Sequence, residues 1–403
     1  MSKIYREDNV LEASQKRISY IFDNFSRIVI SFSGGKDSSI MFHLVADEAR
    51  KRGRKVGVML IDLEAQYKKT IDHVTEMFKL YEDCIELYWV CLPMNLRNAS
   101  SNFEPKWKCW DPEKKSMWVR EMPENCISDV NFFPFFQEGM EFEEFIVLFA
   151  EWYAKGELCA TFVGIRADES LNRYRTVASK SWLRKKEMFN DRPYTTLVVD
   201  KVYNVYPIYD WKTQDIWVYH RLFKDKPHNE IYDFMHKAGV TPSQQRLCQP
   251  YGDDQRRGLW LYHLLEPETW YKVVARVNGA NGMALYVEES GNITGYNKIT
   301  KPEGHTYKSF VNLLLTTMPQ KVREHYLHRF KSFIKGWKSR GYVNDIPDEA
   351  PYILESKHWA PSYRRLCKVL LRNDYWCKGL GLTQPKSDAY GRYLEIKKTR
   401  EAQ

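Results

Sequence analysis

The chain has 403 residues, of which 43% are hydrophobic, and a formal net charge of +9 at pH 7. This length suits two or three domains with a large core. The mean hydropathy of −0.56 and the lack of a long apolar run argue against an integral membrane protein. The first residues lack the apolar centre of a signal peptide and the eight cysteines are scattered, so we expect a cytoplasmic protein with reduced thiols.

The first predicted elements are a helix within residues 1–26 and a buried strand over the β-branched run Arg27–Phe32. Apolar residues then recur at helical spacing up to Arg52, and Gly53 is a natural helix stop. The strand and the second helix are joined by a turn made of Ser33, Gly34, Gly35, Lys36, Asp37 and Ser38.

This turn has the composition of an anion site. Its two glycines let backbone N–H groups approach a ligand closely, and the dipole of the following helix favours negative charge. Lys36 adds a positive charge, and Ser33 and Ser38 add hydroxyl groups. We therefore predict a phosphate-binding loop. The alternative is an ordinary Gly–Gly turn capped by Asp37 or Ser38.

The turn resembles the SGGxDS pyrophosphate loop of the superfamily of PP-loop ATP pyrophosphatases and phosphoadenosine-phosphosulfate (PAPS) reductases. Three later segments resemble the same superfamily in the right order, at residues 62–70, 158–173 and 206–217. The first has Lys68-Lys69 where the family has Pro-Glu. The matching positions in the first two segments are Asp62, Tyr67, Thr70, Gly164, Arg166, Glu169, Ser170 and Arg173.

The second of these segments places two arginines just past the carboxyl end of a predicted strand, where open α/β sheets bind ligands. Guanidinium groups bind phosphate or sulfate oxygens bidentately, so we expect Arg166 and Arg173 to hold the anionic end of a nucleotide. For Glu169 and Arg173 the alternative is a solvated i,i+4 ion pair. Asp62 ends the neighbouring strand, and we expect it to hold Mg²⁺ with Asp37 or to contact the nucleoside.

The resemblance therefore implies an adenine nucleotide, ATP or PAPS, as the substrate, with Mg²⁺. The residues expected to take part in catalysis are Lys36, Asp37, Arg166 and Arg173. The residues expected to bind the nucleotide are Ser33, Gly34, Gly35, Lys36, Asp37, Ser38, Asp62, Gly164, Arg166 and Arg173.

The alternation of strands and helices predicts an α/β fold with a mostly parallel sheet and helices on both faces, similar to the adenine nucleotide alpha hydrolases. We expect this nucleotide domain over residues 1–225, interrupted by an aromatic insert at about 93–157. The insert is predicted to pack as a subdomain, the alternative being a lid over the pocket. Residues 226–403 are predicted to form a mainly helical C-terminal domain.

Residues 360–380 resemble the uncharacterised C-terminal domain of PAPS-reductase-like proteins such as immunoglobulin-binding regulator A. The resemblance implies a protein partner of the ParB/sulfiredoxin-like type. The moderately basic charge permits contact with nucleic acid but does not require it, because a pocket for an anionic nucleotide also attracts positive charge.

Cysteine usage does not match the reductases that reduce sulfate. The chain lacks the Glu-Cys-Gly-Leu-His tail of thioredoxin-dependent PAPS reductases and the paired cysteines of the iron–sulfur enzymes, so we expect no iron–sulfur cluster. Cys248 lies two residues after Arg246, which would suit a nucleophilic thiolate. A buried apolar cysteine is the favoured alternative, and Cys367 is predicted to pack in a helical core.

The predicted function is an enzyme that cleaves the phosphate chain of ATP or PAPS for adenylyl or sulfur-group transfer. A standard thioredoxin-dependent PAPS reductase is not expected. Two alternatives stay open: a nucleotide-sensing regulatory subunit that acts with the ParB/sulfiredoxin-like partner, and a DNA sulfur-modification enzyme.

Overall fold

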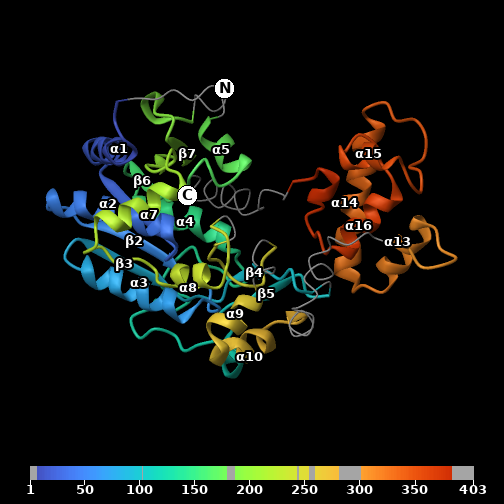
Figure 1. Cartoon of the computed structure of the whole chain (residues 1–403), viewed down its shortest axis with the longest axis horizontal. Helices are drawn as coiled ribbons and strands as arrows, with labels where there is room; N and C mark the ends of the chain where they lie inside the picture. Colours follow the sequence, from blue (N-terminus) through green and yellow to red (C-terminus); the bar gives the residue numbers. More distant parts are fainter. Residues whose placement is uncertain are drawn as a thin grey trace, which may run out of the picture. The chain divides into compact units, whose positions relative to one another are not determined.

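The computed structural model describes residues 7–101, 103–178, 187–242, 245–253, 259–280 and 301–383 (Figure 1). Contacts within the chain define two compact units. The first comprises residues 1–94, 109–248 and 264–266, and the second comprises residues 95–108, 249–263 and 267–403.

The first unit is built on a six-stranded sheet in the order β3-β2-β1-β6-β8-β7. Neighbouring strands run parallel except at one edge, where β7 is antiparallel to β8. The mostly parallel sheet expected from the sequence is thus confirmed. The strands are β1 (Arg27–Phe32), β2 (Val56–Ile61), β3 (Ile85–Val90), β6 (Cys159–Val163), β7 (Thr195–Val199) and β8 (Val202–Val205).

Helices cover both faces of this sheet. Alternate residues of each strand point to opposite faces, so each strand supplies side chains for packing on both. On one face the ring of Phe32 packs against Phe42 of α2 and Phe78 of α3. On the other face Gly57 leaves room for Tyr153 of α4, whose ring would lie 2.8 Å from an added Cβ. The helices of this unit are α1 (Val10–Asn24), α2 (Lys36–Lys51), α3 (Lys68–Leu80), α4 (Phe142–Ala154), α5 (Leu171–Ala178), α7 (Thr213–Leu222) and α8 (Ile231–Lys237). Two short 3-10 helices span Pro112–Met117 and Phe189–Asp191.

Much of the aromatic insert is packed. Phe133, Phe145 and Phe149 are fully buried, and Phe133 lies edge-on to both of the other rings at centroid distances of 5.2 and 5.8 Å. Trp110 is also buried and donates from Nε1 to the backbone oxygen of Asp62. These buried rings agree with the predicted packing, but residues 95–108 of the insert belong to the second unit, so the insert is not one subdomain.

The second unit contains a two-stranded antiparallel ribbon and a helical bundle. The ribbon is β4 (Asn95–Arg97) with β5 (Lys106–Lys108). The bundle core includes Tyr326, Phe330, Leu366 and Cys367, so the prediction of a core position for Cys367 is confirmed. The helices are α9 (Trp260–Leu265), whose last two residues are assigned to the first unit, α10 (Pro267–Arg276), α13 (Tyr307–Thr316), α14 (Gln320–Lys338), α15 (Tyr352–Ser356) and α16 (Tyr363–Leu371), followed by a 3-10 turn at Lys378–Leu380. No described helix is long and apolar enough to cross a membrane.

Two buried histidines make the first unit sensitive to acid. Burial lowers the pKa of His43 and of His73 to about 3, whereas an unfolded histidine titrates near 6.5. Below pH 6.5 the unfolded chain therefore binds protons that the folded chain does not, and stability falls until the pH reaches the folded pKa. At about pH 5.5 each histidine should remove about 1.4 kcal/mol of the free energy of unfolding.

Urea unfolding of the wild type at pH 7 and at pH 5.5 measures this loss, and His43→Gln separates it from the titration of carboxylates. We expect the drop between the two pH values to be smaller in His43→Gln. An equal drop in both proteins would show that His43 does not resist protonation in the fold.

Candidate functional site

The turn between β1 and α2 has the backbone that the sequence predicts for an anion-binding loop. Gly34 has a φ of +71°, a conformation that glycine adopts at little cost. Gly35 is the N-cap of α2, and its cap position carries no side-chain hydrogen bond. The N–H groups of the first helical turn lie at the positive end of the helix dipole, and that of Lys36 donates to the hydroxyl of Tyr232.

Gly34→Ala should destabilise the first unit by about 1 to 2 kcal/mol, because alanine is strained at positive φ. An added Cβ would also lie 2.8 Å from Cγ2 of Thr70. Urea unfolding measures the effect, with Gly53→Ala as a control that has positive φ but open space around it. Equal losses in the two variants would show that the Thr70 contact adds nothing.

Gly164 brings the end of β6 against the start of α2. A Cβ at this position would lie 2.9 Å from the Cα of Ser38 and 3.2 Å from the carbonyl carbon of Asp37. Because these are backbone atoms, only glycine fits. The fold thus brings Gly164 next to Asp37 and Ser38, which lie more than 120 residues earlier in the chain. This agrees with the prediction that all three belong to one site.

Three of the predicted residues form one buried chain of charges. Nε of Arg166 donates to Oδ1 of Asp37 at 2.5 Å, and Nζ of Lys36 lies 3.6 Å from the other carboxylate oxygen. Arg166 also donates to the hydroxyl of Thr213 at 3.2 Å. All three charged residues are at most 9% exposed. Two cations therefore share one carboxylate, which leaves a positive balance beside the N-terminus of α2.

Lys36 is further held by a segment far along the chain. Its Nζ donates to the backbone oxygen of Gln245 at 3.1 Å, and its backbone N–H donates to the hydroxyl of Tyr232 at 3.1 Å. Burial is the main cause that lowers the pKa of Lys36, since it disfavours the charged form. An anion bound at the loop would offset that cost.

The same segment holds the loop backbone. Nδ2 of Asn229 donates to the backbone oxygen of Gly34 at 2.9 Å and to the Thr70 hydroxyl at 3.1 Å. Sequence reasoning did not find Asn229, Tyr232 or Gln245, because no motif marks them and residues 226–403 were assigned to the other domain. Their contacts with the loop lie within the first unit.

Arg173 joins the site only indirectly. Its guanidinium pairs with Glu169, and the same carboxylate accepts the backbone N–H of Arg166 at 3.2 Å. The Arg173 side chain is 43% exposed. The structure thus contains the i,i+4 ion pair given above as the alternative, and a role for Arg173 in phosphate binding stays a prediction.

Asp62 belongs to a different set of contacts. It is fully buried and pairs with Arg120, and it accepts hydrogen bonds from Nε1 of Trp89 at 2.9 Å and from the backbone N–H of Glu64 at 3.0 Å. The pairing with Arg120, 58 residues away in the aromatic insert, carried no sequence signal. Asp62 thus ties the insert to the sheet.

A resident magnesium ion does not fit these residues. Both oxygens of Asp62 accept hydrogen bonds, and both oxygens of Asp37 face cations. A divalent cation would have to displace Arg120 or Arg166, and Mg²⁺ prefers oxygen ligands with several waters. Among the described residues no group of three or more His, Cys, Asp or Glu could hold a metal ion.

Cys248 corrects one expectation from the sequence. The favoured alternative was a buried apolar cysteine, but this thiol is exposed. The described residues around it form neither helix nor strand, so no apolar face forces the side chain inward. It lies in the first unit.

Residues 27–235 match the family described as the phosphoadenosine phosphosulfate reductase domain. Residues 239–346 match DUF3440, a domain of unknown function. A C-terminal domain of this kind is therefore present, but the match ends before the residues 360–380 that suggested it. The immunoglobulin-binding regulator A type stays a prediction.

The chain is 41% identical over 389 residues to the uncharacterized protein YbdN of Escherichia coli (strain K12), covering 96% of this chain and 94% of that protein. It is 25% identical over 222 residues to the uncharacterized protein MJ0066 of Methanocaldococcus jannaschii, covering 54% of this chain and 36% of that protein. The crystal structure of PAPS reductase from Candida auris, a phosphate complex, shares 12% identity with a TM-score of 0.30, covering 58% of this chain and 94% of that one.

The reductase-domain match begins at the first residue of β1 and ends within α8, so it includes the loop, the parallel strands, Asn229 and Tyr232, whereas Gln245 lies beyond it. It spans more than half of the chain. The protein therefore belongs to the phosphoadenosine phosphosulfate reductase domain family.

Proposed function

We propose that the first unit binds an adenine nucleotide, ATP or PAPS, at the loop of residues 33–38 and cleaves its phosphate chain. The observation that carries this proposal is the pair of buried cations, Lys36 and Arg166, beside the N-terminus of α2, whose N-cap residue is a glycine. Burying a charged group costs free energy unless an opposite charge or hydrogen bonds compensate it. Two cations on one carboxylate leave capacity for a phosphate or sulfate group.

In this proposal the loop holds the leaving group. With ATP, an acceptor oxygen forms a bond to the α-phosphorus while the bond to the bridging oxygen breaks, and pyrophosphate leaves against Lys36 and the N–H groups of α2. With PAPS, an acceptor attacks sulfur, the bond between sulfur and the bridging oxygen breaks, and adenosine 3′,5′-bisphosphate leaves. In both reactions positive charge near the developing anion is the main catalytic contribution.

In this proposal, nucleotide binding displaces two contacts that Tyr232 and Gln245 make with Lys36. The Tyr232 hydroxyl now accepts the backbone N–H of Lys36, and the Gln245 carbonyl accepts its ammonium group. A bound phosphate takes both positions as the acceptor. Mg²⁺ enters with the nucleotide, coordinated by phosphate oxygens and water, as part of the substrate.

The organisation around this site is also proposed. The nucleotide domain predicted over residues 1–225 is extended here to include Asn229, Tyr232 and Gln245, which contact the loop, and a helical C-terminal domain follows it. A cytoplasmic location and a ParB/sulfiredoxin-like partner are also proposed. The last rests on family resemblance alone. The regulatory and DNA-modifying alternatives are kept as outcomes of the test.

A product assay with Mg²⁺ tests the proposal, offering ATP and PAPS separately, with and without the candidate partner and DNA. AMP with pyrophosphate identifies an adenylylating enzyme. Adenosine 3′,5′-bisphosphate identifies sulfur chemistry, with a sulfated product marking transfer and, when a thiol reductant is supplied, sulfite marking reduction. Binding without product in every condition contradicts the enzyme and favours the regulator, and no binding contradicts the nucleotide site itself.

A further inference from the structure

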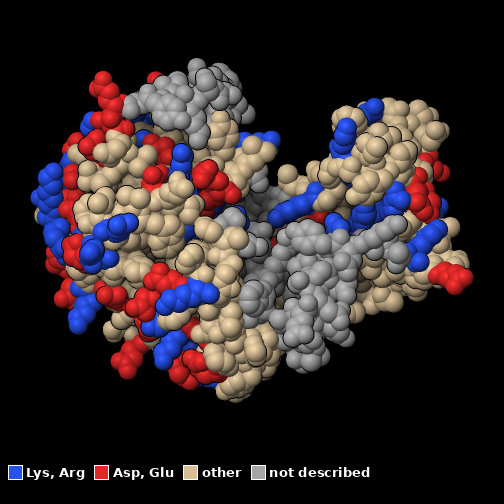
Figure 2. Space-filling view, in the orientation of Figure 1, with Lys and Arg blue, Asp and Glu red and all other residues tan. Residues whose placement is uncertain are grey.

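The positive charge of the chain is concentrated in the helical bundle of the second unit. Residues 301–383 contain fifteen Lys and Arg against seven Asp and Glu, a net charge of +8, compared with +9 for the whole chain. Figure 2 shows Lys and Arg side chains over the part of the molecule drawn in orange and red in Figure 1. The PP-loop is not in this region, so binding a nucleotide there does not explain the charge.

Part of this charge forms a stripe along α14. Lys331, Lys335 and Lys338 recur at intervals of four and three residues and are exposed, so they share one face of the helix. The opposite face is buried, with Tyr326 and Phe330 in the bundle core. Among the described residues none of the three lysines has a carboxylate within ion-pair distance. The stripe thus presents cations that no carboxylate in the described part of the chain neutralises.

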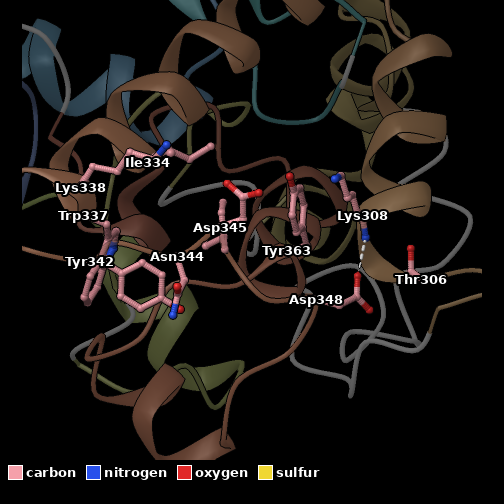
Figure 3. A pocket seen from close by; sticks show the side chains of 11 residues that line it. Thr306, Lys308, Ile334, Trp337, Lys338, Tyr342, Asn344, Asp345, Asp348 and Tyr363 are labelled. Carbon is pink, nitrogen blue, oxygen red and sulfur yellow. Dashed lines mark hydrogen bonds between the residues drawn. The ribbon is translucent and has the colours of Figure 1, made fainter.

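The stripe ends at a cavity of about 340 Å³, a size in the range of ligand sites. Lys338 lines it, together with Trp337, Tyr342, Asp345 and Lys308. In Figure 3 the Trp337 and Tyr342 side chains lie together at one end and Lys308 at the other. The Trp337 and Tyr342 rings are 6.1 Å apart at 77°, so they form an aromatic corner.

Polar groups complete the wall of the cavity. Asn344 and Asp345 are exposed and line it. Asp348 is already used by the fold, because its carboxylate accepts the backbone N–H groups of Tyr307 and Lys308 at the start of α13. Asn344 and Asp345 therefore remain as hydrogen-bonding groups that could face a ligand.

We infer that this part of the bundle binds single-stranded nucleic acid, with one unpaired base in the cavity and the backbone along the lysines of α14. Sequence-tolerant strand binding combines a positive track for phosphates with aromatic rings on which bases stack. A base in a duplex could not enter the cavity, because its hydrogen-bonding edge contacts the partner base and its two faces contact the stacked neighbours. A carboxylate beside the aromatic corner suits the amino groups of a base and would repel a phosphate, which separates the base position from the backbone position.

Binding of a labelled single strand of about 15 nucleotides to the full-length protein, measured by fluorescence anisotropy over a salt series, tests this inference. DNA and RNA strands are compared with the same duplex and with polyphosphate. We expect the strand to bind more tightly than the duplex. The triple variant Lys331→Ala, Lys335→Ala, Lys338→Ala should weaken strand binding at least tenfold and reduce the salt slope by about 2. A triple variant at exposed lysines of the first unit, Lys51, Lys55 and Lys79, is the charge-matched control.

The aromatic corner is tested separately. Tyr342→Ala should weaken binding of the strand about fivefold or more while leaving polyphosphate binding unchanged. Tyr342→Phe should retain strand binding. Tyr352 is 71% exposed on α15 and does not line the cavity, so Tyr352→Ala is the matched control.

Several results would overturn the inference. They are no binding of any strand, a preference for duplex, equal losses in the two lysine triples, or a Tyr342→Ala protein that binds the strand as the wild type does. The inference goes beyond the proposed function and does not depend on it. Lys36→Met, which should impair nucleotide binding, is expected to bind the strand normally, so failure at one site is distinguishable from failure at the other.

Discussion

Arg166→Leu is expected to lower the free energy of unfolding by about 3 kcal/mol, the cost of leaving a buried charge without its partner. Arg166 is 2% exposed, and its Nε lies 2.5 Å from Oδ1 of Asp37. Lys36 remains 3.6 Å from Asp37 in the variant, which keeps the expected loss at the lower end of the range for a broken buried pair. The contact with Thr213 is lost as well. Urea unfolding at pH 7 measures this loss in the free energy of unfolding.

Two variants show whether the charge pair is the cause. Asp37→Asn, Arg166→Leu and their combination form a double-mutant cycle that gives the coupling free energy between the two side chains. We expect the double variant to lose less than the sum of the two single losses, although Lys36 then also lacks the Asp37 carboxylate. Arg173→Leu breaks an ion pair whose arginine is 43% exposed, and it should cost at most about 1 kcal/mol. A loss below 1 kcal/mol for Arg166→Leu would mean that Asp37 and Arg166 are more hydrated than their burial indicates.

Local signals made the centre of this fold predictable. The run Arg27–Phe32 and the turn after it combine a strand pattern, a glycine that needs positive φ and a helix start within about ten residues, and each is decided by neighbours in sequence. The mostly parallel sheet was predictable from the alternation of strand and helix patterns along the sequence. Arg166 was found because it follows a strand end, and the topology brings such ends to one edge of a sheet.

Long-range partners could not be predicted in the same way. Asp62 has the sequence position of a ligand-binding carboxylate, yet its partner Arg120 comes from the insert and turns it into a structural ion pair. Tyr232 and Gln245 reach Lys36 across about 200 residues with no motif to mark them. Cys248 was expected to be buried because cysteine often is, but it is exposed in a segment whose described residues form neither helix nor strand.

The proposed nucleotide site overlaps contacts that Lys36 makes within the fold. A phosphate bound at the loop would compete with the Tyr232 hydroxyl and the Gln245 carbonyl for Lys36. A ligand shifts such an equilibrium only by its difference in affinity for the two arrangements. The charge of Lys36 supplies that difference, because it gains an anion in exchange for a carbonyl group.

Lys36→Met is expected to weaken nucleotide binding or turnover at least tenfold, a loss of about 1.4 kcal/mol or more. Methionine keeps most of the apolar stem but removes the charge that faces the phosphates. Isothermal titration with ATP and with PAPS, in the presence of Mg²⁺, measures the affinity. The product assay measures the turnover.

The same variant separates a binding role from a structural one. Removing an ammonium group that burial already disfavours should leave the free energy of unfolding within about 1 kcal/mol of the wild type. Because burial lowers the pKa of Lys36, the wild type should lose its advantage over Lys36→Met as the pH rises through that lowered pKa, where the amine becomes neutral. Lys51→Met changes an exposed lysine in the last turn of the same helix and should bind as the wild type does. Unchanged affinity and turnover in Lys36→Met, with the fold intact, would remove the loop from the nucleotide site.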